Sequence, residues 1–241
     1  TIGSVLVLLI SNRVGLRQRM LTQAEIGSVE LGDLKQLLLA IAKITLVVEC
    51  SVAFILFLRF WQGGYEDGPL SSAYSALFHS IAAFNNSGLS LYPDNLARFV
   101  GDPVVVSTVS AGFIIGGLGF PIIVELLRRR QLRRDAGTAR KPRWSLHARI
   151  TLLSTAALIV IGVVCVTAFE WANPATLGGL DLFDKVLAGW FQGVTPRTAG
   201  FNTVDIGGMH ESTLVVTAIL MFIGAGPAST PGGIKVTTFA V

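Results

Sequence analysis

Apolar residues along this chain fall into long runs that alternate with shorter runs ending in polar, glycine-centred loops. The long runs cover residues 37–60, 103–127 and 145–169, and each supplies the roughly twenty apolar residues that a membrane-spanning helix needs. The run that leads into Asn85 has only roughly ten such residues, too few to cross a bilayer. Irregular backbone at membrane depth is tolerated only where protein surrounds it or water reaches it. The unit from 70 to 102 therefore predicts a re-entrant pore loop between two spans.

The same arrangement recurs further along the chain. Residues 191–202 again pass from an aromatic residue into a small polar loop, so that Ser-Gly-Leu-Ser at 87–90 aligns with Ala-Gly-Phe-Asn at 199–202. An aspartate follows each loop, at Asp94 and Asp205. The spacing predicts an internal repeat of about 110 residues, with a second re-entrant unit that ends near Met209.

The last apolar run begins near Ser212 and is interrupted. After about eleven residues, or roughly 16 Å of helix, it reaches the segment from Gly224 to Lys235. Four glycines and two prolines among the ten residues 224–233 are incompatible with a regular helix. We expect this helix to break near the middle of the membrane.

Composition agrees with a membrane protein. The chain is 51% hydrophobic and only 14% charged, with a mean hydropathy of +0.63, whereas soluble domains average about 25% charged residues. The predicted fold class is an all-α integral membrane protein built from repeated span–pore loop–span units with re-entrant pore helices. Cys50 and Cys165 both lie in apolar runs, which indicates neither a disulfide framework nor a metal site, and we expect no cofactor.

Charge gives the predicted orientation. Nine basic residues and one acid, Asp135, lie between Arg128 and Arg149, and short loops rich in Lys and Arg stay on the cytoplasmic side. Both re-entrant units then lie outside. A basic loop between two spans indicates contact with anionic lipid rather than with nucleic acid.

The predicted organisation has three parts. Residues 1–35 form the end of an earlier repeat and a cytoplasmic connector, 36–142 form one span–pore–span repeat, and 143–241 form the next with a broken last helix. No signal peptide is recognisable, and we expect that Thr1 begins inside a larger protein.

The two glycine loops suggest ion coordination. A cation that leaves water needs oxygens to replace its hydration shell, and rings of backbone carbonyls provide them in potassium-selective filters. Glycine accepts the backbone conformations that such a ring requires, and Gly88 and Gly200 stand where this demand arises. Glu49, near the middle of the first span, is expected to face the bundle interior with a polar partner, with a direct role as an ion ligand as the alternative.

The residues fit other classes of protein less well. His79 adjoins Ser80, but neighbours on a helix point apart and do not form a nucleophile–base pair, so we expect no enzyme. The final glycine run lacks the adjacent Gly-Lys of a phosphate-binding loop. A secondary transporter with broken helices and a non-conducting membrane scaffold remain open, although a scaffold has no need for two matched glycine loops.

Three motifs together resemble the Trk/Ktr/HKT superfamily of cation transporters, and the Ktr-type membrane subunit is the nearest match. Residues 78–90 resemble the second pore loop of that superfamily, 195–203 its third, and 226–238 the intramembrane gating loop of its third repeat. The resemblance extends from the end of the first repeat into the third. It implies potassium uptake across the cell membrane through a filter to which each of four repeats gives one glycine. A sodium-permeable or sodium-coupled transporter of the same superfamily is the alternative.

The resemblance also implies roles for particular residues and partners. Potassium would bind backbone carbonyls of the two filter loops, contributed by Asn86, Ser87, Gly88, Thr198, Ala199 and Gly200. A flexible barrier below the filter would include Gly224, Gly226, Ser229, Thr230, Gly232, Gly233 and Lys235. The implied partners are a second copy in a homodimer and a cytosolic nucleotide-binding ring that docks on the basic loop.

Overall fold

The computed structural model describes residues 34–135, 144–226, 229–230 and 232–239. The chain divides into two compact units, 1–47 and 48–241, and the packing below concerns the second. The predictions for residues 1–33 and for the end of the basic loop at 136–143 lie outside the described residues. The helices, in chain order, are α3 (Leu34–Gln62), α4 (Pro69–Phe84), η2 (Ala97–Phe99), α5 (Pro103–Leu118), α6 (Phe120–Asp135), α7 (Leu146–Glu170), α8 (Leu182–Val194), η3 (Ile206–Gly208), α9 (Glu211–Phe222) and α10 (Val236–Phe239).

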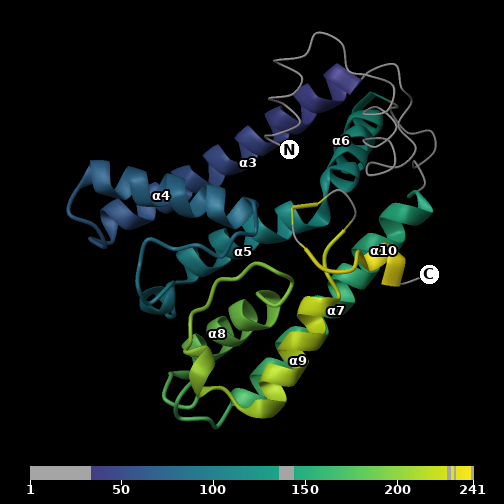
Figure 1. The fold of residues 1–241 in the computed structure, drawn as a ribbon. Coiled ribbons are helices and arrows are strands. Elements are labelled where there is room, and N and C mark those ends of the chain that lie inside the picture. Colours follow the sequence, from purple (N-terminus) through teal and green to yellow (C-terminus); the bar gives the residue numbers. More distant parts are fainter. Residues whose placement is uncertain (1–33, 136–143, 227–228, 231, 240–241) are drawn as a thin grey trace. The chain divides into compact units, whose positions relative to one another are not determined.

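The described residues form a helical fold without a named strand (Figure 1), which confirms the predicted all-α class. Two helices are long and apolar enough to cross a membrane, Leu39–Gln62 and Leu146–Glu170. They agree with the predicted first and third spans to within a few residues. The short helices α4 and α8 take the places predicted for the re-entrant pore helices.

The predicted second span is wrong as a single straight helix. α5 and α6 meet at Gly119 with a bend of 97°. Gly119 has a φ of 84°, which a residue with a side chain rarely adopts, and Pro121 follows with no amide hydrogen to donate. The basic stretch predicted as a loop from 128 is also wrong in its first part, because α6 continues to Asp135.

The core of the second unit lies between the two short helices and α5. It combines side chains from α3, α4, α5 and α8 with the second filter loop and with Leu96 and Phe99 beyond the first, and its fully buried members include Leu56, Val109, Phe191, Ala199 and Phe201. The rings of Phe113 on α5 and Phe191 on α8 meet edge to face at 5.8 Å. The second polar loop that the sequence predicts at membrane depth is thus packed into the protein core through Ala199 and Phe201, as irregular backbone there requires.

Glycines let the helices approach closely. A Cβ on Gly116 of α5 would lie 2.0 Å from the carbonyl oxygen of Phe84, and one on Gly162 of α7 would lie 2.2 Å from that of Gly193 on α8. The backbone at the end of each re-entrant helix therefore packs against a neighbouring helix, α4 against α5 and α8 against α7. The absence of a side chain at Gly116 thus serves close packing, and the bend at Gly119 ends the same helix.

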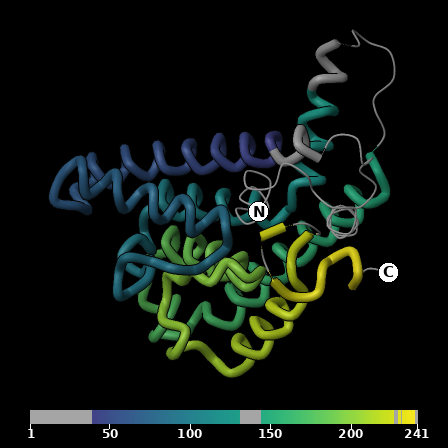
Figure 2. Tube along the Cα trace, turned by 45° about the horizontal axis from the view of Figure 1, so that its top comes forward, coloured from purple at the N-terminus to yellow at the C-terminus, as the bar shows by residue number. Residues whose placement is uncertain are grey.

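The final helix breaks as predicted. α9 ends at Phe222, beside α7, and the two ends of the segment that follows lie side by side (Figure 2), where Ile223 and Ile234 form an isolated parallel bridge. The amide of Gly224 donates to the carbonyl of Ile234 at 2.9 Å, and the amide of Ile234 donates to Phe222 at 3.1 Å. The described residues from Gly224 to Lys235 thus belong to a paired loop, called the gate loop below, and not to a helix.

Candidate ion-filter and gate site

The first filter loop begins where α4 ends. The amides of Asn85, Asn86 and Ser87 donate to the carbonyls of Ile81, Ala83 and Ala82 at 3.0 Å each, so the chain leaves the helix in a tight turn. Asn86 then adopts a φ of 53° and Gly88 a φ of 66°. The carboxyl end of a helix carries about half a negative charge, which favours a cation nearby.

The second filter loop repeats this backbone. α8 ends at Val194, Thr198 has a φ of 63° and Gly200 a φ of 78°. In each loop, a left-handed residue stands two positions before a left-handed glycine. The repeat that the sequence predicts from residue types is therefore present in the backbone conformation, because Asn86 corresponds to Thr198 and Gly88 to Gly200.

The two glycines meet. A Cβ on Gly88 would lie 2.6 Å from the Cα of Gly200, and one on Gly200 would lie 2.9 Å from the Cα of Gly88. Positive φ and this backbone contact both exclude a side chain at either position. The structure thus brings the two predicted filter glycines together from segments more than a hundred residues apart.

The other predicted filter residues surround this contact in different ways. Ser87 is exposed, Thr198 is half-buried, and Ala199 is fully buried. The Ser87 hydroxyl donates to the carbonyl of Ala82 at 3.2 Å, so its side chain holds the loop to α4. The coordination of an ion by backbone carbonyls of these residues stays a prediction.

The gate loop reaches the first filter loop. Thr230 accepts a hydrogen bond from Nδ2 of Asn86 at 2.8 Å and donates to the carbonyl of Phe84 at 3.2 Å. The amide of Gly226 donates to the carbonyl of Gly117 on α5 at 3.0 Å. The predicted gate residues therefore contact both the base of the filter and the end of α5.

The other predicted gate residues shape the loop itself. Ser229 donates to the carbonyl of Gly226 at 2.5 Å. A Cβ on Gly224 would lie 2.1 Å from the oxygen of Gly232, and Gly233 has a φ of 80°. Lys235 precedes α10, where its carbonyl accepts from the amides of Thr238 and Phe239.

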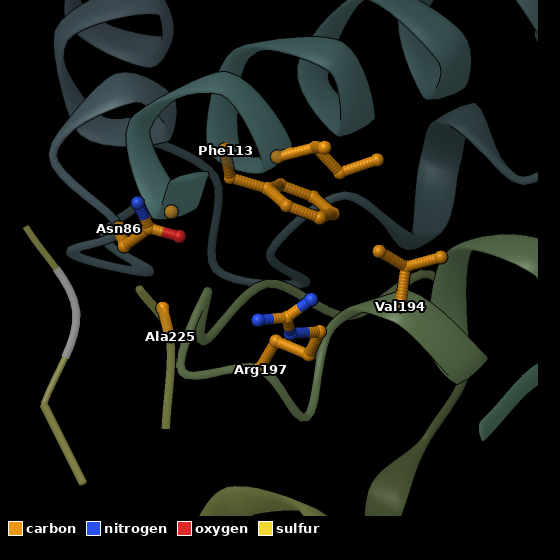
Figure 3. Close-up of a pocket in the computed structure, with 7 residues that line it drawn as sticks. Asn86, Phe113, Val194, Arg197 and Ala225 are labelled. Carbon is orange, nitrogen blue, oxygen red and sulfur yellow. The ribbon is translucent and has the colours of Figure 1, made fainter. Parts of the chain in front are cut away.

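A small cavity lies where the filter loops, α5 and the gate loop meet (Figure 3). It is lined by Asn86, Phe113, Ile114, Gly117, Val194, Arg197 and Ala225. Arg197 is only 8% exposed, and its Nη1 donates to the carbonyl of Thr155 on α7 at 3.2 Å. Its Nε and Nη2 have no partner among the described residues.

No role was predicted for Arg197, although a charged residue within a loop of small side chains marks an unusual site in a membrane protein.

Glu49 faces the interior with a polar partner, as expected. Its Oε1 accepts from Nδ2 of Asn85 at 3.1 Å, and its backbone carbonyl accepts from the Ser80 hydroxyl at 2.6 Å. The hydroxyl of Ser80 is thus committed to α3, while Nδ1 of His79 contacts the carbonyl of Ser75 and Nε2 contacts Ser90. His79 and Ser80 form no nucleophile–base pair, as the sequence predicted.

Two carboxylates organise the loops outside the filter, and the sequence assigned a role to neither. Glu66 accepts from Ser71, Ser75 and Tyr92 at 2.5–2.7 Å. Burial raises the pKa of Glu66, but these three hydrogen bonds outweigh burial and leave the pKa below its ordinary value. In the next repeat, Glu170 accepts from Asn173, Thr176, Thr213 and the amide of His210.

Comparison with known proteins gives a consistent result. The family model described as TrkH, cation transport protein, matches residues 3–241. The Ktr system potassium uptake protein B of Bacillus subtilis is 40% identical over 242 residues, which cover all of this chain and 52% of that protein. The protein of the same name from Vibrio alginolyticus is 38% identical, again over all of this chain and 51% of its own length.

Among solved structures, the crystal structure of the potassium transporter TrkH from Vibrio parahaemolyticus matches with a TM-score of 0.61 and 17% identity. The match covers 92% of this chain and 43% of that one. At this sequence identity, the match is evidence for a similar fold and for nothing more. The chain spans about half the length of the curated relatives it matches.

Proposed function

Because this chain belongs to the TrkH family of cation transport proteins, we propose that it forms part of a potassium uptake pathway across the cell membrane. The single observation that carries the proposal is the meeting of Gly88 and Gly200, each at positive φ at the end of a re-entrant helix. The names of the Ktr system relatives, which are potassium uptake proteins, favour potassium as the ion.

The filter acts through backbone oxygens. Backbone carbonyls of both loops replace the hydration shell of potassium. They belong to Asn86, Ser87 and Gly88 in one loop and to Thr198, Ala199 and Gly200 in the other. The carboxyl ends of α4 and α8 lead into these loops and add favourable negative potential. Segments beyond these two repeats complete the ring around the ion.

The gate loop is the barrier below this filter. It interrupts the last apolar run and includes Gly224, Gly226, Ser229, Thr230, Gly232, Gly233 and Lys235. The hydroxyl of Thr230 accepts a hydrogen bond from Asn86 in the first filter loop. Ions pass when the paired limbs of this loop move away from α5 and Asn86.

Partners follow from the same proposal. The protein is a multi-pass subunit that forms a homodimer in the bilayer, and a cytosolic nucleotide-binding ring docks on the basic segment 128–144. The guanidinium of Arg129 in α6 lies over the ring of Trp144 at 3.9 Å, so this contact joins the start of that segment to its last residue. No enzymatic activity and no nucleic-acid partner are part of the proposal.

The experiment is rubidium flux into liposomes that contain the full-length parent protein. Wild-type protein should carry rubidium down its gradient without added sodium, whereas Gly88→Asp and Gly200→Asp proteins that still fold should lose flux or selectivity. Flux that strictly requires a sodium or proton gradient would support the secondary transporter with broken helices. Preference for sodium over rubidium would support the sodium-permeable alternative.

A further inference from the structure

The chain just beyond the two filter glycines is tied together across the repeats. The amide of Leu96 donates to the carbonyl of Asn202 at 3.1 Å, and the amide of Asn202 donates to Oδ1 of Asn95 at 3.4 Å. Both backbone polar groups of Asn202 are thus satisfied by two consecutive residues of the other repeat. Asn202 stands two positions after Gly200. These two hydrogen bonds therefore attach the second filter loop to Asn95 and Leu96.

Asn95 also contacts the first filter loop. Its Nδ2 donates to the carbonyl of Gly88 at 3.4 Å. One side-chain amide therefore bridges the two loops, with its oxygen on one and its nitrogen on the other. An amide group offers a donor and an acceptor in one plane, as a peptide unit does, and here it takes the place of a backbone pairing between loops that are not strands.

The conformation of Asn95 fits this task. Its φ is 56°, a left-handed region that Asn tolerates better than other residues with side chains, glycine apart. Its own carbonyl accepts from the hydroxyl of Ser90 at 3.0 Å, and that hydroxyl also contacts Nε2 of His79 at 3.0 Å. His79 is fully buried on α4, so the bridge is anchored to a pore helix.

We propose that Asn95 is a positioning residue for ion selectivity, which sets the spacing between the Gly88 and Gly200 loops through its two side-chain hydrogen bonds. This inference rests on the proposed function, because it assumes that the two loops share an ion site. Discrimination between cations depends on the number and placement of the coordinating carbonyls. A bridge that joins the carbonyl of Gly88 to the amide of Asn202 constrains that placement without touching the ion.

The test replaces Asn95 with glycine. Asn95→Gly keeps the left-handed backbone and removes both side-chain hydrogen bonds. Each hydrogen bond of this kind favours the bonded arrangement by a free energy that changes an equilibrium constant roughly three- to tenfold. We expect the ratio of rubidium to sodium flux in liposomes to fall by about that factor, with total cation flux retained.

A second variant separates the two contacts. Asn95→Asp keeps the Oδ1 acceptor for Asn202 but loses the donor to Gly88. Amide exchange of the segment around Asn202, followed by mass spectrometry on the full-length protein, should accelerate in Asn95→Gly and stay near wild type in Asn95→Asp. The matched control is Ala97→Gly, which loosens the same outer loop but removes no side-chain hydrogen bond, and it should keep wild-type selectivity.

The outcomes are distinct. Unchanged exchange around Asn202 in Asn95→Gly, or wild-type selectivity in that variant, would overturn the inference. An equal loss of selectivity in Ala97→Gly would also overturn it, because loop flexibility would then suffice. A wild-type protein without cation flux would contradict the proposed function, while the exchange measurement would still decide whether Asn95 holds the two loops together.

Discussion

Asn86 in the first filter loop donates a hydrogen bond of 2.8 Å to the hydroxyl of Thr230 in the gate loop. The two residues are 144 positions apart in the chain and come from successive repeats. The same hydroxyl donates to the carbonyl of Phe84, the last residue of α4. The position of the gate loop is thereby linked to the base of the filter.

The first prediction concerns this link. Thr230→Val keeps the shape of the side chain and removes both hydrogen bonds, so the closed position of the gate loop should lose stability. The loss of about 1 kcal/mol for each of the two hydrogen bonds, or about 2 kcal/mol together, should raise rubidium flux of the full-length protein by up to roughly thirtyfold. Thr230→Ser retains the hydroxyl and should behave as wild type. Lower flux in Thr230→Val than in Thr230→Ser would count against a closing role for this contact.

The second prediction concerns the contact between α5 and the filter loop. In Gly116→Ala, the new methyl group would stand 2.0 Å from the carbonyl oxygen of Phe84, so the end of α4 must move. Overpacking of this kind costs about 1–3 kcal/mol and should lower both the thermal midpoint and the ion flux.

Gly179→Ala is the control, since its Cβ would have an ordinary contact of 3.7 Å with the carbonyl of Pro174. Equal thermal midpoints for the two variants would show that α5 and the filter loop do not approach as closely as described.

The third prediction concerns pH. Because three hydrogen bonds lower the pKa of Glu66 below its ordinary 4.5, ionised Glu66 stabilises the fold fully above about that pH. This stabilisation should be lost as the pH falls through the lower pKa of the folded state. Thermal midpoints of wild type and Glu66→Gln should therefore differ most at neutral pH and converge on acidification. If the difference between the thermal midpoints of wild type and Glu66→Gln grew as the pH fell, ionised Glu66 would not stabilise the fold in this way.

The fourth prediction concerns Glu49. Glu49→Gln keeps an oxygen that can accept from Asn85, whereas Glu49→Leu leaves Nδ2 of Asn85 without this partner. We expect Glu49→Leu to be less stable than Glu49→Gln by about 1–3 kcal/mol, as measured by chemical denaturation or by thermal midpoints in detergent. If Glu49→Gln loses rubidium affinity while its stability is unchanged, the carboxylate itself acts on the ion, as the alternative interpretation of Glu49 held.

Much of the fold was predictable because membrane spans impose strong patterns. The long apolar runs predicted α3 and α7, the short runs predicted α4 and α8, and the glycines and prolines after Phe222 predicted the end of α9. The bend between α5 and α6 was not predicted, because a glycine at 119 and a proline at 121 within an apolar run are compatible with either a packing face or a break. The boundaries of the three predicted parts, 1–35, 36–142 and 143–241, stay a prediction.

The candidate site was predictable only where it repeats. Gly88 and Gly200 were found because matched loops recur at a fixed spacing, but their direct contact depends on how α5 packs between the pore helices. Asn95 could not be singled out, since an Asn in an outer loop is ordinary until its side chain is seen to join two loops. Arg197 was visible as a charge, yet its contact with Thr155 depends on the close approach of α7 and α8 at Gly162 and Gly193.

The most direct test of the central claim is anomalous diffraction from crystals of the full-length parent protein grown with rubidium. If the loops around Gly88 and Gly200 form one filter, a rubidium peak should lie in coordinating contact with backbone oxygens of both loops, and it should disappear in Gly200→Asp. Rubidium bound elsewhere, or bound to the oxygens of one loop only, would contradict the claim that the two glycines serve a common ion site.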